Sequence, residues 1–510
     1  MKLTRILAYG FVLLISGFLL FYNLDDRLLW GDEAETALLA VNIAKTGLPK
    51  VTDGRNNITI FGMGIDSNGD HIWTARPFLD QYLTALSFLA FGKNTFAARF
   101  PFALLGILTI ALLAAVTYRI YNDHRIALMT AVLLSSNIVF LLHVRQCRYY
   151  AIIMFLEVIL FYGYHSLINR QTVSGSILIS VALIGQFYCN YIIVASNIIA
   201  LLLTSAYVIR KKHFVFYYLF VSILIVFIFS GPWLIYAKPF FQTSVISLHR
   251  FWENMRDYAY IVNAYFIALL ILLIPVFRLI NARIAHKYDD FRLFARESEL
   301  LVWVLIPSII LPISCIPYVA MRYISPLLPL SALITASILT YHVPRKSIRY
   351  TLFTVLCFSN AIPAFTVGNL NPGTLLRVPI VEFVKEITQG YQDRLSDIVS
   401  YLIQNGNPEQ SVLVGDPEFP LIFYTGMRII DFRLANQDRS QELPDWVLST
   451  SASGIKEMPP IEIEDNTAQR YETINLRVHD SKRGDSIPDP RLRESFTTDR
   501  FTAMKIFRKK

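Results

Sequence analysis

Long apolar runs separated by short polar breaks dominate the first 367 residues of the chain. A run of about 20 apolar residues is long enough to cross the hydrocarbon layer of a bilayer as a helix. The pattern therefore predicts a membrane protein of the all-α class, built as a polytopic helical bundle. We predict eleven spans, at about residues 4–22, 96–118, 126–143, 149–167, 174–188, 191–209, 214–236, 258–279, 300–317, 323–341 and 347–367.

The first external loop, residues 23–77, is polar but carries aromatic and aliphatic residues throughout, so we expect it to be ordered. A helix is predicted within this loop from Ala34 to Lys45. The apolar run that follows, residues 78–91, has only 14 residues and contains Asp80 and Gln81. Because such a run is too short to cross a bilayer comfortably, we assign it to a helix that lies at the membrane interface.

Basic residues alternate between loops in the way that the positive-inside rule requires. They occur in every second loop, at Arg119 and Arg125, at Arg170, at Arg210–Lys212, from Arg278 to Arg296 and from Arg345 to Arg349. These loops and the N-terminus are therefore predicted to be cytoplasmic, and the first external loop and residues 368–510 to be extracytoplasmic. Counting residues 78–91 as a span would invert this alternation. The membrane we expect is a bacterial inner or plasma membrane.

Residues 368–510 form a second predicted domain, distinct from a transmembrane domain at residues 1–367. Pieces that look extended occur at 411–415, 421–424 and 471–474, and a helical stretch occurs at 381–404. These pieces lie among mixed charges. They predict a small extracytoplasmic domain of the α/β or α+β class.

The charge of the chain is divided unequally between these two parts. In total, 47 Lys and Arg oppose 38 Asp and Glu, a formal charge of +9. Residues 368–510 hold 18 basic and 21 acidic residues, or −3, which leaves 29 against 17, or +12, for residues 1–367. The basic character thus belongs to membrane loops, and we expect no nucleic-acid partner. The four cysteines lie in or beside apolar runs without paired spacing, so they predict neither a zinc site nor a disulfide framework.

A cluster of three acids at residues 32–35 directly follows the first span and its short polar connection. Asp32 and Glu33 are our candidates for catalytic carboxylates. The alternative is a solvated helix start, in which Asp32 is the N-cap and Glu33 and Glu35 fill the first turn.

Several arginines fall on the external side, against the positive-inside pattern. An anion held at the membrane surface would account for them, because guanidinium matches the geometry of phosphate oxygens. The candidates for phosphate binding are Arg76, Arg145, Arg148 and Arg322, and Tyr149 and Tyr323 are candidates for lining the substrate. The alternative is that these arginines anchor to lipid headgroups and that the tyrosines are ordinary interfacial aromatics.

The order and sidedness of these motifs resemble the GT-C membrane glycosyltransferases over residues 1–367. Within that group the chain is most similar to the branch of protein O-mannosyltransferases and lipid A aminoarabinose transferases. The motifs that carry the resemblance are Asp32-Glu33, Arg76-Pro77-Phe78, Gly92-Lys93-Asn94-Thr95-Phe96-Ala97-Ala98-Arg99-Phe100-Pro101 and Arg322-Tyr323-Ile324-Ser325-Pro326-Leu327-Leu328-Pro329. The chain departs from the aminoarabinose branch at Glu35-Thr36, where that branch often has Arg-Tyr, and at Arg145 and Arg148, where it carries an acid.

The resemblance implies a GT-C-type fold and a donor in which a polyprenyl phosphate carries a monosaccharide, hexose or pentose. The sugar would pass to a lipid, glycan or protein acceptor of the cell envelope, on the extracytoplasmic side. Asp32 would be the essential acid of the first loop, and Arg76 would contact the donor phosphate. Apart from donor and acceptor, the expected partners are membrane lipids. Whether a divalent cation joins the acids stays open.

Two other functions compete with this one. A transporter of an anionic lipid or metabolite would also need external arginines, but its site should lie near the membrane midplane with intramembrane charge. Glu157 is the one acid inside a predicted span that would fit such a site. A surface-polysaccharide polymerase or ligase would differ mainly in the size of its donor.

Overall fold

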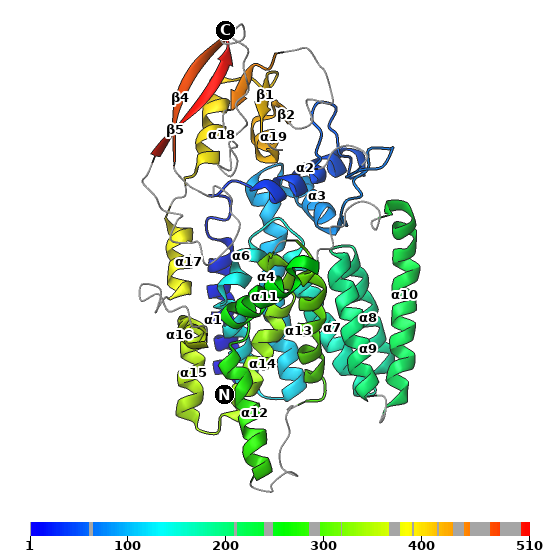
Figure 1. Cartoon of the computed structure of the whole chain (residues 1–510). Helices are drawn as coiled ribbons and strands as arrows, with labels where there is room; N and C mark the ends of the chain where they lie inside the picture. The colour runs from blue at the N-terminus through cyan, green and yellow to red at the C-terminus, as the bar shows by residue number, and fades with distance from the viewer. Residues whose placement is uncertain are drawn as a thin grey trace. The chain divides into compact units, whose positions relative to one another are not determined.

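The computed structural model describes residues 2–60, 65–208, 212–238, 248–284, 296–317, 319–366, 378–389, 392–415, 418–431, 443–448, 470–479 and 501–510. The chain divides into two compact units (Figure 1). The first unit comprises Met1–Tyr22 and Phe102–Ile387, and the second comprises Asn23–Pro101 and Thr388–Lys510. The second unit therefore combines residues 23–101, which include the loop predicted to be external, with the C-terminal region. The domain boundary expected at 367/368 lies at residues 367–377, outside the described part of the chain.

The first unit is helical. Its helices are α1 (Lys2–Phe21), most of α4 (Thr95–Tyr121), α5 (His124–Ser135), α6 (Ile138–Val144), α7 (Tyr150–Ile168), α8 (Thr172–Phe187), α9 (Tyr191–Val208), α10 (His213–Ala237), η2 (Leu248–Arg250), α11 (Phe251–Tyr265), α12 (Leu269–Ile284), α13 (Glu299–Ser314), η3 (Met321–Ile324), α14 (Leu327–His342), α15 (Lys346–Phe358), α16 (Ala361–Thr366) and α17 (Pro379–Thr388).

Five helices among the described residues are long and apolar enough to cross a membrane, namely α1 from Leu3, α4, α7, α9 and α10. The number rises to seven if each of two bent pairs, α5 with α6 and α11 with α12, forms one span. Helices α8, α13 and α14 are apolar but shorter. The predicted membrane character is thus confirmed, whereas the predicted count of eleven spans is not. Several predicted spans correspond to helices that are short or broken.

The break in the first bent pair lies at Asn137, where α5 and α6 meet at 66°. The Asn137 side chain caps α6 by accepting a hydrogen bond from the Phe140 amide at 3.0 Å. Its Nδ2 donates to the Tyr265 carbonyl at 2.7 Å, at the end of α11, where the second pair bends by 86°. Backbone groups freed by a helix break inside a membrane need such partners. One side chain therefore supports both breaks.

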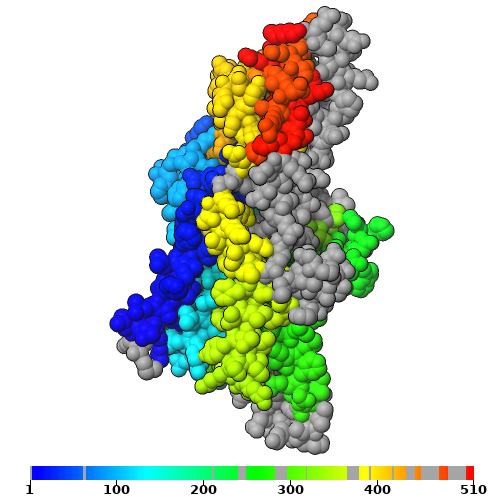
Figure 2. Space-filling view, turned by 90° about the vertical axis from the view of Figure 1, so that its left-hand side faces the viewer, coloured from blue at the N-terminus to red at the C-terminus, as the bar shows by residue number. Residues whose placement is uncertain are grey.

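Close packing holds the centre of the first unit together. Helices α7 and α8 approach so closely that a Cβ at Gly175 would lie 2.7 Å from the Leu167 amide nitrogen and 2.8 Å from the Gly163 carbonyl oxygen. Small residues at helix contacts allow this approach in membranes. Helix α1, in contrast, exposes Leu7, Phe11 and other apolar side chains. The blue N-terminal part of the chain lies at the surface in Figure 2. An exposed apolar face of this kind suits contact with lipid.

A polar cluster lies within the packed helices α7, α8 and α9. The fully buried Glu157 accepts hydrogen bonds at its Oε2 from Gln186 Nε2 and Asn197 Nδ2, each at 2.8 Å. Asn197 Nδ2 also donates to Gln186 Oε1 at 2.8 Å. The intramembrane acid that the sequence singled out is thus held by two amides from neighbouring helices.

The second unit contains two helices from residues 23–101 and a mixed sheet from the C-terminal region. The helices are α2 (Gly31–Thr46) and α3 (Leu79–Phe91), so the helices predicted at 34–45 and 78–91 are confirmed. The C-terminal elements are α18 (Arg394–Asn405), β1 (Ser411–Val414), α19 (Phe419–Thr425), β2 (Arg428–Asp431), β3 (Trp446–Leu448), β4 (Tyr471–His479) and β5 (Phe501–Lys509).

The strand order is β2-β1-β3-β5-β4, with β1 parallel to β2 and β3, and β5 antiparallel to β3 and β4. The predicted α/β or α+β structure of this region is confirmed, and strands β1 and β4 lie at the extended pieces predicted at 411–415 and 471–474. The prediction of an extended segment at 421–424 is wrong, because these residues lie in α19, which has Pro420 in its first turn and is capped by Gly426 in the left-handed conformation. The predicted helix at 381–404 is two helices, since Asp393 caps a new start.

Candidate active site

The acid cluster lies at the N-terminal end of α2, in the second unit. Trp30 is the N-cap, and its amide donates to Glu33 Oε2 at 3.4 Å, so Glu33 closes the first turn. Glu33 and Glu35 are buried, at 0% and 2% exposure, whereas Asp32 is partly exposed. The helix N-terminus favours negative charge at Asp32. Of the three acids, Asp32 is the most exposed.

Glu33 belongs to a buried ion pair with Arg99 of α4. The Arg99 guanidinium donates from Nε to Glu33 Oε1 at 2.9 Å and from Nη2 to Oε2 at 2.6 Å. It also donates to three backbone carbonyls of the segment that leads into α2, those of Leu24 at 3.0 Å, Arg27 at 2.7 Å and Leu28 at 3.0 Å. The geometry therefore gives Glu33 a structural task. The sequence motif contained Arg99, but its partner was not foreseen.

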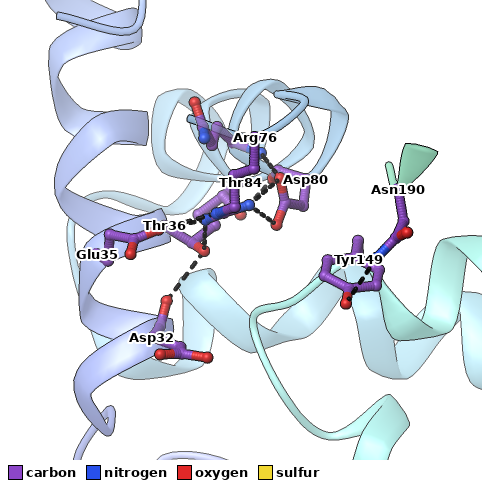
Figure 3. Close-up of polar contacts among 9 residues, drawn as sticks. Asp32, Glu35, Thr36, Arg76, Asp80, Thr84, Tyr149 and Asn190 are labelled. Carbon is purple, nitrogen blue, oxygen red and sulfur yellow. Dashed lines mark hydrogen bonds and ion pairs between the residues drawn. The ribbon is translucent and has the colours of Figure 1, made fainter. Parts of the chain in front are cut away.

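Arg76 lies between α2 and α3 and contacts side chains of both helices (Figure 3). Its Nη2 donates to Glu35 Oε1 at 2.7 Å and to Thr36 Oγ1 at 2.8 Å. Its Nη1 donates to Asp80 Oδ2 at 2.8 Å. Asp80 is fully buried, and the Arg76 side chain is 16% exposed. The carboxylates of Glu35 and Asp80 thus compensate the charge of the Arg76 guanidinium, which was predicted to bind phosphate.

Sequence reasoning missed both carboxylate partners of Arg76. The spacing of Asp80, four residues after Arg76, was a usable signal for an ion pair. The sequence suggests a first-turn acid at Glu35 and shows Glu35-Thr36 as a departure from the aminoarabinose branch, whereas in the structure both residues are partners of Arg76. The departure therefore has a local structural explanation.

The other arginines and the two tyrosines lie in the first unit. Arg145 donates from Nη1 to the carbonyls of Leu19 at 2.9 Å, Leu20 at 3.1 Å and Tyr22 at 3.0 Å. These carbonyls belong to the C-terminal end of α1, where a cation is favourable. Arg145 is thus used to cap a helix.

Arg148 and Arg322 come together around Tyr149. Both guanidinium groups are close enough to the Tyr149 hydroxyl to act on it electrostatically. Arg148 Cζ lies 5.8 Å from the Tyr149 ring centre, and Arg322 Cζ lies 5.5 Å from that of Tyr323. Asn190 Nδ2 donates to the Tyr149 hydroxyl at 3.1 Å (Figure 3). This arrangement brings four predicted residues into one neighbourhood, with two cations beside a buried phenol.

His143 lies in the same neighbourhood. Its Nδ1 is 2.7 Å from the Val139 carbonyl oxygen, and its ring meets Tyr150 edge-on at 5.0 Å. Among the residues that the structure describes, no group of three or more His, Cys, Asp or Glu side chains is arranged to hold a metal ion.

Comparisons with known proteins place this geometry in context. Residues 75–236 match the sequence model of the family described as dolichyl-phosphate-mannose-protein mannosyltransferase. No curated protein sequence is significantly similar to the chain.

Among the solved structures that share the fold are two of ArnT from Cupriavidus metallidurans. The form bound to undecaprenyl phosphate has 14% identity and a TM-score of 0.60, with 92% of this chain and 96% of that chain covered. The apo form has 13% identity and a TM-score of 0.63, with 99% and 98% covered. The chain therefore has the ArnT-like GT-C fold, and part of it is similar in sequence to the dolichyl-phosphate-mannose-protein mannosyltransferases.

Proposed function

We propose that the protein is an integral membrane glycosyltransferase that moves a monosaccharide from a polyprenyl-phosphate donor to an extracytoplasmic acceptor. The fold, the mannosyltransferase match and the lipid phosphate bound to ArnT support this proposal. The observation that carries it is the contrast within the acid cluster. Glu33 and Glu35 are buried and form ion pairs with arginines, whereas Asp32 is partly exposed at a helix N-terminus.

Asp32 would be the general base or the orienting carboxylate for the acceptor. As the acceptor hydroxyl or amine attacks the anomeric carbon, its proton passes to the Asp32 carboxylate. The bond between that carbon and the phosphate oxygen breaks, and the lipid phosphate leaves with one additional negative charge. Proton transfer to a positioned group typically contributes 10²–10⁴-fold to such a rate. Glu33 would contribute only through its effect on the position of Asp32.

Arg148 and Arg322 would hold the donor phosphate. Both guanidinium groups lie near the Tyr149 hydroxyl, so a phosphate at this place could accept charged hydrogen bonds from each of them. Tyr149 and Tyr323 would line this place. The sequence grouped Arg76 and Arg145 with these arginines, but their contacts with carboxylates and helix carbonyls favour a positioning role for both.

The phosphate-binding step can be tested by measuring donor binding. The donor lipid that co-purifies with the protein would first be identified by mass spectrometry. Its affinity would then be measured in nanodiscs of neutral lipid, where headgroup attraction is absent. Replacing Arg148 or Arg322 by Ala should weaken binding by about 10- to 100-fold, because each charged hydrogen bond contributes on the order of 1.5–3 kcal/mol.

The Lys variants should recover charge without the two-pronged geometry, so they should rescue binding only in part. Arg125→Ala is a matched control, because Arg125 is an exposed arginine of the same unit. Unchanged donor affinity in both alanine variants would refute phosphate binding by these residues.

A further inference from the structure

The phenol of Tyr424 on α19 forms a polar link between the C-terminal region and the segment before Asp32. The Leu29 amide donates to the Tyr424 hydroxyl at 2.8 Å, and the same hydroxyl lies 2.8 Å from Thr95 Oγ1. All three residues belong to the second unit. Burial raises the pKa of Tyr424, so its proton stays in place at neutral pH. Because the phenol oxygen accepts from Leu29, its proton is available to Thr95.

The segment held in this way, residues 24–30, has no regular secondary structure and leads directly into α2. Its backbone is fixed by side chains from elsewhere. Arg99 binds three of its carbonyls, Tyr424 binds the Leu29 amide, and Glu33 binds the Trp30 amide. Leu28 also packs against the core of the C-terminal sheet. The position of Asp32, two residues beyond Trp30, therefore depends on two distant elements, α4 and α19.

A second contact holds the C-terminal region to the loop independently of Tyr424. Asn56, at 3% exposure, donates to the Met427 carbonyl at 3.2 Å and accepts from the Ile429 amide at 2.8 Å. Arg55 Nη2 donates to the Pro408 carbonyl at 2.8 Å. Removing the Tyr424 hydroxyl should thus loosen the segment without detaching the sheet.

We propose that the C-terminal domain acts as a positioning element for the catalytic acid, and that it does so through the hydroxyl of Tyr424. This inference rests on the proposed role of Asp32. Tyr424 itself would touch neither donor nor acceptor; it would hold the chain that carries the base. Small displacements of a reacting group can cost as much as 100-fold in rate, so the effect should appear in the chemical step.

Tyr424→Phe tests this proposal, because it removes the hydroxyl and keeps the ring. Tyr471→Phe is the matched control, since Tyr471 also makes a 2.7 Å hydrogen bond, to the Pro444 carbonyl, but does so within the C-terminal domain. Hydrogen–deuterium exchange of the full-length protein would be followed in the peptide that contains the Leu29 amide. We expect exchange there to rise by about tenfold in Tyr424→Phe and to stay unchanged in Tyr471→Phe.

Kinetics separate positioning from a general loss of stability. We expect Tyr424→Phe to lower kcat by about 10- to 100-fold while KM for the donor changes less than about twofold. Thr95→Val should have a smaller effect in the same direction, because it leaves the Leu29 hydrogen bond in place. Equal exchange in the two phenylalanine variants would overturn the proposal, as would faster exchange with an unchanged kcat. If the wild-type protein transfers no sugar, the proposed function fails, while the exchange measurement still decides whether Tyr424 holds the segment.

Discussion

Replacing Glu33 by Gln distinguishes a structural acid from a catalytic one. The wild-type carboxylate accepts two hydrogen bonds from Arg99, at 2.9 and 2.6 Å, and both side chains are buried, at 0% and 6% exposure. The amide keeps the shape of the side chain and one acceptor oxygen. It leaves the Arg99 guanidinium buried with its charge no longer compensated by Glu33.

The expected loss in the free energy of unfolding is large for a single polar substitution. Removing one partner of a buried ion pair costs about 3–5 kcal/mol, and the remaining acceptor oxygen favours the lower end. With an unfolding entropy of about 2.1 cal/mol/K per residue over 510 residues, a loss of about 3 kcal/mol corresponds to a fall in Tm of roughly 3 °C. Asp32→Asn should lower the free energy of unfolding by less than about 1 kcal/mol, because Asp32 is partly exposed and stabilises the fold mainly through its charge at the helix N-terminus.

Thermal unfolding of the two variants in the same detergent provides the assay, with the catalytic rate measured alongside. We expect Glu33→Gln to be strongly destabilised, and Asp32→Asn to be as stable as the wild type but inactive. If Glu33→Gln unfolds at the wild-type temperature, the buried ion pair does not hold the start of α2, and the structural role assigned to Glu33 is wrong.

Two further predictions concern the first unit and the topology. Glu157→Gln should leave Tm nearly unchanged, because it keeps an acceptor for the amides of Gln186 and Asn197. Glu157→Leu should lower the free energy of unfolding by about 1–3 kcal/mol for each donor left unsatisfied. Equal Tm values for the two variants would show that the cluster does not contribute to stability. Cysteines introduced at the exposed positions Arg125 and Glu409 should be labelled by impermeant reagents from opposite faces of the membrane, the first from the cytoplasmic face. Labelling of both from one face would contradict the predicted topology.

The sequence predicted most of the helices because apolar runs and caps are local signals. Helix α2 and strands β1 and β4 lie where their patterns placed them. The short run 421–424 was misassigned because four apolar residues fit a strand and a buried helix equally well. The bend at Asn137 was hidden within an apparently continuous apolar run, and only its partner across the bundle, the Tyr265 carbonyl, makes the break stable there.

The candidate site was only partly predictable for a different reason. Sequence can identify an arginine on an unexpected side of the membrane, but its partners come from the tertiary fold. Arg76 and Arg145 are taken up by carboxylates and helix carbonyls, while Arg148 and Arg322 gather around Tyr149. Similarly, the adjacent acids Asp32 and Glu33 look equivalent in the sequence. They differ in the structure because Arg99, 66 residues from Glu33, forms an ion pair with Glu33.

The most direct test of the account is the rate of sugar transfer by Asp32→Asn. The purified protein, reconstituted in nanodiscs, would receive its co-purifying polyprenyl-phosphate sugar in radiolabelled form, with an extract of the cell envelope as acceptor. Asn keeps the size and hydrogen bonding of Asp but is a poor proton acceptor. The account predicts a loss of about 10²–10⁴-fold in kcat with donor affinity unchanged. Near-normal turnover by Asp32→Asn would contradict it.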